Sequence, residues 1–117
     1  MLKTAFLDNR HKLIEESSDL ALPDLLMNDQ KFDLAYIDGW HTFDYTLIDI
    51  FYCVKLVKEG SFIIIDDRHV PGVDKAVKYF DTNYTSQLEI VNGPPSLRIY
   101  KKISDLDFRK WHEHVPF

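Results

Sequence analysis

Two short apolar runs stand out along the chain, and acidic residues follow each of them. Phe32–Ile37 leads into Asp38, and Ser61–Ile65 leads into Asp66 and Asp67. Short runs that are apolar at nearly every position and rich in β-branched residues are typical of strands covered on both faces. We therefore predict two central strands whose carboxyl ends carry carboxylates.

The segment between these runs has the pattern of an amphipathic helix. Thr42 is a candidate capping residue, Lys55 and Lys58 suit the last turn, and Gly60 suits the left-handed conformation that ends a helix. The apolar face of this helix consists of Leu47, Ile50, Phe51, Val54 and Val57. A strand, a helix and a strand within about 35 residues form a right-handed crossover, which predicts that the two strands are parallel.

The rest of the chain predicts further elements on both sides of this unit. In chain order they are an edge strand at His11–Glu15, a helix at Leu20–Met27 capped by residues 17–19, an amphipathic helix that begins at Pro71, a strand pair at Leu88–Val91 and Leu97–Tyr100, and a short helix at Ser104–Trp111. Strands and helices in this order are typical of an α/β domain. No linker or repeat divides residues 1–117, so we expect a single domain.

The composition of the chain suits a globular protein in the cytoplasm. It has 117 residues, 45% of them hydrophobic, which is enough for a core. Fourteen basic residues against nineteen acidic ones leave a net charge of −5 without a basic run, which argues against a nucleic-acid partner. No stretch of about 20 apolar residues predicts a membrane span. The single cysteine, Cys53, lies in an apolar helical stretch, and we interpret it as a packing residue.

The acidic strand ends are the first candidates for chemistry. If the two central strands are neighbours, Asp38 and Asp66 lie about 5 Å apart in backbone terms, with Asp67 beside them. Converging carboxylates repel one another, and Mg²⁺ or Ca²⁺ relieves that repulsion because these cations prefer oxygen ligands. Two interpretations remain open here: a divalent-cation site, or Asp38 and Asp67 as caps of the following turns with Asp66 solvated.

The residues just after Asp38 offer further chemistry at the same rim. His41 has an unperturbed pKa near neutrality and is a candidate general base toward a substrate hydroxyl, although a histidine before a helix is also often a capping or surface residue. Trp40 offers a flat face to a ring-containing ligand, or packs as part of a lid.

Three segments in order carry a resemblance to a known family: KFDLAYIDGWH, VKEGSFIIIDD and VPGVDKAVKYF. From about residue 11 to about residue 102 the chain resembles the second half of a class I S-adenosylmethionine-dependent methyltransferase of the small-molecule O-methyltransferase type, similar to the catechol and macrocin enzymes. The resemblance implies a three-layer Rossmann-like α/β fold, with a mostly parallel sheet and a C-terminal antiparallel strand pair, that lacks its first two strands.

The resemblance also implies roles for individual residues. In metal-dependent members the matching acids bind magnesium, which carries over to Asp38, Asp66 and Asp67. The catechol enzyme has Asp-His-Trp-Lys where this chain has Asp-Gly-Trp-His, and its lysine is the general base, which carries over to His41. Cofactor contacts carry over to Asp38, Gly39 and Trp40, and the acceptor is implied to be a small molecule.

One part of the family pattern has no counterpart here. The family begins with a strand and a glycine-rich turn that hold the methionine part of the cofactor, whereas the four glycines of this chain are Gly39, Gly60, Gly72 and Gly93. We therefore expect an incomplete cofactor site and an uncovered sheet edge, and predict a homodimer or a domain-swapped form that covers it. Three functions remain as alternatives: metal-dependent O-methylation, a non-catalytic oligomerisation or binding module, and another metal-assisted reaction such as hydrolysis.

Overall fold

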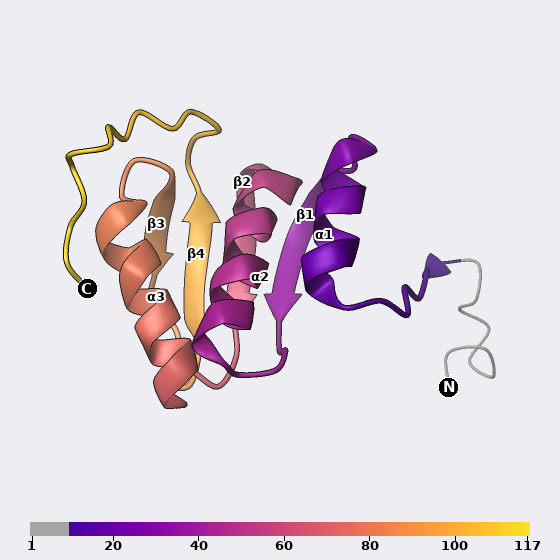
Figure 1. The fold of residues 1–117 in the computed structure, drawn as a ribbon, viewed down its shortest axis with the longest axis horizontal. Coiled ribbons are helices and arrows are strands. Elements are labelled where there is room, and N and C mark those ends of the chain that lie inside the picture. Colours follow the sequence, from indigo (N-terminus) through magenta and orange to yellow (C-terminus); the bar gives the residue numbers. More distant parts are fainter. Residues whose placement is uncertain (1–9) are drawn as a thin grey trace.

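A computed structural model describes residues 10–117, which form a four-stranded sheet and three helices (Figure 1). The elements are α1 (Ser18–Met27), β1 (Phe32–Ile37), α2 (Phe43–Leu56), β2 (Val57–Ile65), α3 (Pro71–Asn83), β3 (Leu88–Val91) and β4 (Arg98–Lys102). The strand order is β1-β2-β4-β3. Strands β1 and β2 are parallel, and β4 is antiparallel to both of its neighbours. Within this range no helix is long and apolar enough to cross a membrane.

The central crossover forms as the pattern of apolar residues predicts. Ile37 at the end of β1 pairs with Ile65 at the end of β2. The backbone N–H of Asp66 donates a hydrogen bond of 3.0 Å to the carbonyl of Ile37, so both strands end at the same edge of the sheet. The helix at 18–27, the helix that begins at Pro71 and the final strand pair are also confirmed, with the last strand shifted to Arg98–Lys102.

Two predicted elements are wrong. His11–Glu15 is not a strand: the outer edge of β1 stays unpaired within residues 10–117, and this segment does not form a ladder there. Ser104–Trp111 is not a helix, because its polar side chains bond to backbone N–H groups two residues ahead: Ser104 Oγ accepts from Leu106 at 3.0 Å, and Asp107 Oδ1 from Arg109 at 3.1 Å. Such local bonds compete with helix formation.

Gly60 adopts the left-handed conformation but does not end the helix. Helix α2 ends at Leu56, and both Lys58 and Gly60 lie within β2. Gly60 has a φ of 85° where the β1–β2 register shifts, with Phe32 opposite Val57 and Leu34 opposite Phe62. Gly60 therefore allows the irregularity in the strand, because a residue without a Cβ adopts a positive φ at low cost.

The helices all lie on one face of the sheet (Figure 1), and the core is formed between these two layers. Its fully buried members include Ile63 and Tyr100 from the sheet, Ile50 from α2, and Val77 and Phe80 from α3. The predicted packing role of Cys53 agrees with its buried position, where burial raises the pKa of its thiol to about 12.

No element among residues 10–117 covers the opposite face of the sheet. The side chains of Leu34 and Tyr36 are 57% and 56% exposed, and Phe62, the register partner of Leu34, is 39% exposed. The expected three-layer fold with a mostly parallel sheet is therefore corrected for residues 10–117: they form two layers, and two of the three strand pairings are antiparallel. This is an α/β fold with a mixed sheet.

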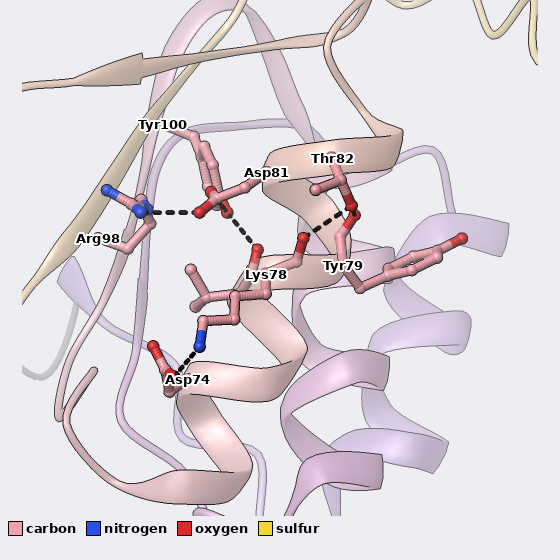
Figure 2. A network of polar contacts seen from close by, with 8 residues as sticks. Asp74, Lys78, Tyr79, Asp81, Thr82, Arg98 and Tyr100 are labelled. Carbon is pink, nitrogen blue, oxygen red and sulfur yellow. Dashed lines mark hydrogen bonds and ion pairs between the residues drawn. The ribbon is translucent and has the colours of Figure 1, made fainter. Parts of the chain in front are cut away.

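A polar network fixes α3 to β4 (Figure 2). Asp81 of α3 accepts a hydrogen bond of 2.7 Å from Arg98 Nη2 and one of 2.6 Å from Tyr100 Oη. The hydroxyl of Tyr100 also lies 3.1 Å from the carbonyl oxygen of Val77. Burial, followed by the bond to the Asp81 carboxylate, raises the pKa of Tyr100 far above its ordinary value. The network holds α3 in place, and the first turn of α3 in turn contacts the loop after β1.

Candidate functional site

Three side chains with metal-ligating atoms converge at the carboxyl ends of the parallel strands. Asp38 follows β1, His41 lies in the loop before α2, and Asp67 follows β2. One ligand atom from each of the three lies within 4.8 Å of the other two. His41 Nε2 is 2.9 Å from Asp67 Oδ2 and 3.6 Å from Asp38 Oδ1. We call these three residues the rim cluster; it unites two of the three predicted acids with the predicted histidine.

The backbone is strained at two members of the rim cluster. His41 has a φ of 73° and Asp67 a φ of 55°. Positive φ is uncommon for residues other than glycine, although aspartate and histidine tolerate it better than most, and such conformations cost on the order of 1–3 kcal/mol each. Strain of this kind is concentrated at functional sites, where the surrounding structure holds it in place.

Asp66, the third predicted ligand, points to other partners. Its Oδ2 accepts a hydrogen bond of 2.7 Å from Tyr36 Oη, and its Oδ1 accepts one of 2.8 Å from the backbone N–H of Asp67. The bond with Tyr36, followed by the one with Asp67, lowers the pKa of Asp66. The same bond with Asp66 raises the pKa of Tyr36 to about 12. Asp66 thus shapes the turn after β2 and holds Tyr36.

Tyr36 was not singled out from the sequence as a site residue. The only signal in the sequence is that Tyr36 lies two residues before Asp38; the register that pairs it with Ile64, two residues before Asp66, comes from the structure. In a parallel pair this places a long polar-tipped side chain next to the rim.

The rim cluster fits a divalent cation. The Nε2 atom of His41 is shielded from solvent and makes no hydrogen bond to the residues that the structure describes, although two carboxylates lie close to it. The carboxylate oxygens of Asp38 and Asp67 are the ligands that Mg²⁺ prefers, whereas softer divalent metals would also accept the imidazole nitrogen. The two carboxylates would also repel each other less with a cation between them.

Two glycines allow the loop that carries Asp38 and His41 to pack closely. A Cβ atom at Gly72, in the first turn of α3, would lie 2.7 Å from the carbonyl oxygen of His41 and 2.8 Å from the backbone N of Phe43. A Cβ atom at Gly39 would lie 2.9 Å from Asp49 Oδ2. Gly72 requires glycine because the atoms around it belong to the backbone, whereas at Gly39 the Asp49 side chain would have to move.

A small pocket lies where the loop after β1 and helix α2 meet the beginning of α1. It has a volume of about 330 Å³ and is lined by Ser17, Ser18, Trp40 and Tyr45. The Trp40 side chain is 77% exposed, so its ring is available to a ligand. We call this the Trp40 pocket. The sequence indicated Trp40 either as a ring-binding residue or as lid packing, but it indicated residues 17 and 18 only as helix caps and did not indicate Tyr45.

Asp49 lies beside this pocket and is buried. Asp49 is only 8% exposed, and its Oδ1 atom has no hydrogen-bond partner among the described residues. Burial raises the pKa of Asp49 above its ordinary value, an effect that a hydrogen bond with Ser18 opposes. The carboxylate therefore links the beginning of α1 to the middle of α2 at an electrostatic cost.

Comparisons with known proteins agree with this architecture. A family model described as a methyltransferase domain matches residues 1–68, more than half of the chain. The solved structure of the O-methyltransferase NovP matches with a TM-score of 0.54 and 14% identity, over 64% of this chain and 31% of that one.

Two structures of CalS11 match to a similar degree. The apo structure of this TDP-rhamnose 3′-O-methyltransferase of calicheamicin biosynthesis has a TM-score of 0.56 and 19% identity, over 76% of this chain and 40% of that one. A second structure of the calicheamicin methyltransferase CalS11 has a TM-score of 0.56 and 20% identity, over 76% of this chain and 36% of that one. The chain therefore spans 31–40% of the length of these solved proteins, and at such identities the likeness shows the fold alone.

Proposed function

Because the chain belongs to the methyltransferase-domain family, we propose that it acts in the S-adenosylmethionine-dependent O-methylation of a small molecule, with a divalent cation at the rim cluster. The observation that carries this proposal is the convergence of Asp38, His41 and Asp67 outside the carboxyl ends of β1 and β2. Open α/β sheets bind their ligands in that crevice.

The two aspartates of the rim cluster and His41 have different parts in this proposal. Asp38 and Asp67 are the residues that would hold the cation, and Mg²⁺ is the ion that the family resemblance implies. A cation bound there would polarise the acceptor hydroxyl and lower its pKa. With the cation held by the two carboxylates alone, His41 Nε2, which makes no hydrogen bond to residues 10–117, keeps its lone pair to accept the proton of that hydroxyl, and the Asp67 carboxylate 2.9 Å away stabilises the resulting imidazolium.

The Trp40 pocket is the place that we propose for the adenine ring of S-adenosylmethionine. The exposed face of Trp40 suits stacking with a flat ring, and the hydroxyl groups of Ser17 and Ser18 suit the polar edge of such a ring. Asp38 and Gly39, which the resemblance also assigns to the cofactor, belong to the same loop as Trp40.

A second candidate function follows from the uncovered sheet face. Leu34, Tyr36 and Phe62 expose apolar surface there, and β1 leaves one backbone edge unpaired among the described residues. A second copy of this chain would cover both features symmetrically, and we propose the homodimer that the sequence predicts. If the rim binds neither cofactor nor metal, a non-catalytic oligomerisation module is the function that remains.

Titration calorimetry with S-adenosylmethionine, with and without Mg²⁺, tests the main proposal. Binding of S-adenosylmethionine is expected to be tighter with Mg²⁺ present. Metal binding without cofactor binding would refute methylation by this chain and favour another metal-assisted reaction. Absence of both would leave the oligomerisation module, for which light scattering should give the mass of a dimer.

Matched substitutions then locate the cation. At about 100 times its Kd, a bound cation stabilises the folded state by about 2.7 kcal/mol, which is a measurable rise in Tm. Asp67→Asn should remove this rise, whereas Asp66→Asn should keep most of it because Asp66 is bonded to Tyr36 instead. Asp74→Asn, on α3 in an ion pair with Lys78, is the charge-matched control. Loss of the rise in Asp66→Asn alone would refute the rim cluster as the site.

A further inference from the structure

A second cavity lies at the end of the sheet opposite to the rim cluster. Its volume is about 380 Å³, and four basic side chains line it together with Asp105 and Asp107. The four are Lys31, which precedes β1, Lys55 in the last turn of α2, Lys102 at the end of β4, and Arg109 in the C-terminal segment. The lining therefore has an excess of two positive charges in a chain whose net charge is −5.

Two of the four basic groups are neutralised by neighbouring carboxylates. Arg109 donates to both oxygens of Asp107, at 2.8 Å from Nε and 2.6 Å from Nη2, and it also donates to Tyr79 Oη. Lys102 is 1% exposed, pairs with Asp105, and donates a bond of 2.8 Å to the carbonyl of Val57. An ammonium group has three donors, so Lys102 retains one.

The other two basic groups have no acidic partner among residues 10–117. Lys31 Nζ donates a bond of 2.8 Å to the carbonyl of Lys55, and Lys55 Nζ lies 5.1 Å from the centroid of the Phe51 ring. Their charges nevertheless reach the cavity. The pKa of Asp105 is lowered chiefly by Lys102 and to a smaller extent by Lys31, and that of Asp107 is lowered to about 2 chiefly by Arg109 and least by Lys55.

The partial negative charge at the C-terminal end of α2 explains why some of these basic side chains lie here, but not all of them. Lys31 does donate to a carbonyl in the last turn of α2, as basic side chains commonly do there. Lys102 likewise donates to the carbonyl of Val57, the residue that caps α2, and pairs with Asp105, whereas Lys55 makes no such bond among residues 10–117 and its charge has no acidic partner there. The two uncompensated charges and the spare donor all face one cavity.

We propose that this cavity binds a small molecule with a phosphate monoester group, held by the ammonium groups of Lys31, Lys55 and Lys102. A phosphate monoester carries a charge of about −1.5 to −2 at pH 7, which matches the excess of two positive charges. A lysine ammonium group binds phosphate as a point charge from any direction, so three lysines from separate parts of the chain can bind one phosphate group together. Phe51 and Leu26 in the cavity wall provide contact for an apolar group on the ester.

The test is titration calorimetry of the full chain with phenyl phosphate at fixed pH and ionic strength, without S-adenosylmethionine or Mg²⁺. Saturable binding is expected, and inorganic phosphate should bind more weakly because it lacks the ring. The Lys31→Gln, Lys55→Gln double variant should bind phenyl phosphate at least about tenfold more weakly, because hydrogen bonds to charged groups are the strong ones.

The matched control is the Lys75→Gln, Lys78→Gln double variant, which removes the same charge from α3, away from the cavity lining. It should bind phenyl phosphate as the unchanged chain does. Absence of saturable binding, equal weakening in both double variants, or binding of phenol as tight as that of phenyl phosphate would each overturn the proposal. Thermal unfolding of each variant shows that the folded state is being compared.

Discussion

Replacement of Gly72 by alanine should move the loop that carries His41. The added Cβ atom would lie 2.7 Å from the His41 carbonyl oxygen, 2.8 Å from the Phe43 nitrogen and 3.2 Å from the Thr42 carbonyl carbon. All three are backbone atoms, so no side chain can rotate away to make room. Either the start of α3 or the 41–43 loop must shift, and the network of Asp81, Arg98 and Tyr100 resists movement of α3.

The expected magnitude follows from two opposing effects. Overpacking in a well-packed region costs about 1–3 kcal/mol, whereas alanine in a helix is favoured over glycine by about 0.5–1 kcal/mol. The free energy of unfolding should therefore fall by about 1–2 kcal/mol in Gly72→Ala, which is a decrease of about 4–8 °C in Tm for a domain of this size. Urea and thermal unfolding measure both quantities.

A second glycine provides the control for this experiment. At Gly93 the added Cβ would meet the Cδ1 atom of Ile99 at 2.7 Å, which is the far end of a flexible side chain. Gly93→Ala should therefore cost less, and it should leave the rise in Tm on addition of Mg²⁺ unchanged, while Gly72→Ala should reduce that rise. Equal stability of the two variants, or a Gly72→Ala protein as stable as the original chain, would refute the reasoning.

Three further predictions concern polar groups. Tyr100→Phe removes the bond to Asp81, and urea unfolding should show a loss of about 1–3 kcal/mol, the cost of leaving a buried acceptor less satisfied. The folded state raises the pKa of Asp49, so the free energy of unfolding of the protein falls as the pH rises from the unfolded value of 3.8 through the folded pKa and Asp49 ionises. Asp49→Asn should therefore stabilise the protein at neutral pH and not below pH 3.8, as measured by urea unfolding at the two pH values. Tyr36 should ionise only near pH 12, read from the difference in absorbance between the original chain and Tyr36→Phe, and Asp66→Asn should return this pKa toward 10.

Most of the fold could be predicted because its signals are local. The apolar runs at Phe32–Ile37 and Ser61–Ile65 indicate buried strands, and a helix between them enforces a parallel pair. The wrong elements are those that depend on distant partners or on competing local bonds. His11–Glu15 has the composition for a strand but joins no ladder within residues 10–117, and Ser104 bonds to the backbone two residues ahead instead of opening a helix.

By itself, the sequence determined that acids and a histidine meet at one edge of a parallel pair, because chain order and strand direction are sufficient to place them there. Only the tertiary structure decided which of these groups face one another. Asp66 and Asp67 are adjacent in the chain, yet one bonds to Tyr36 and the other lies beside His41. That choice depends on the positive φ of Asp67 and on the register that brings Tyr36 near the rim, and neither property is contained in a run of apolar residues.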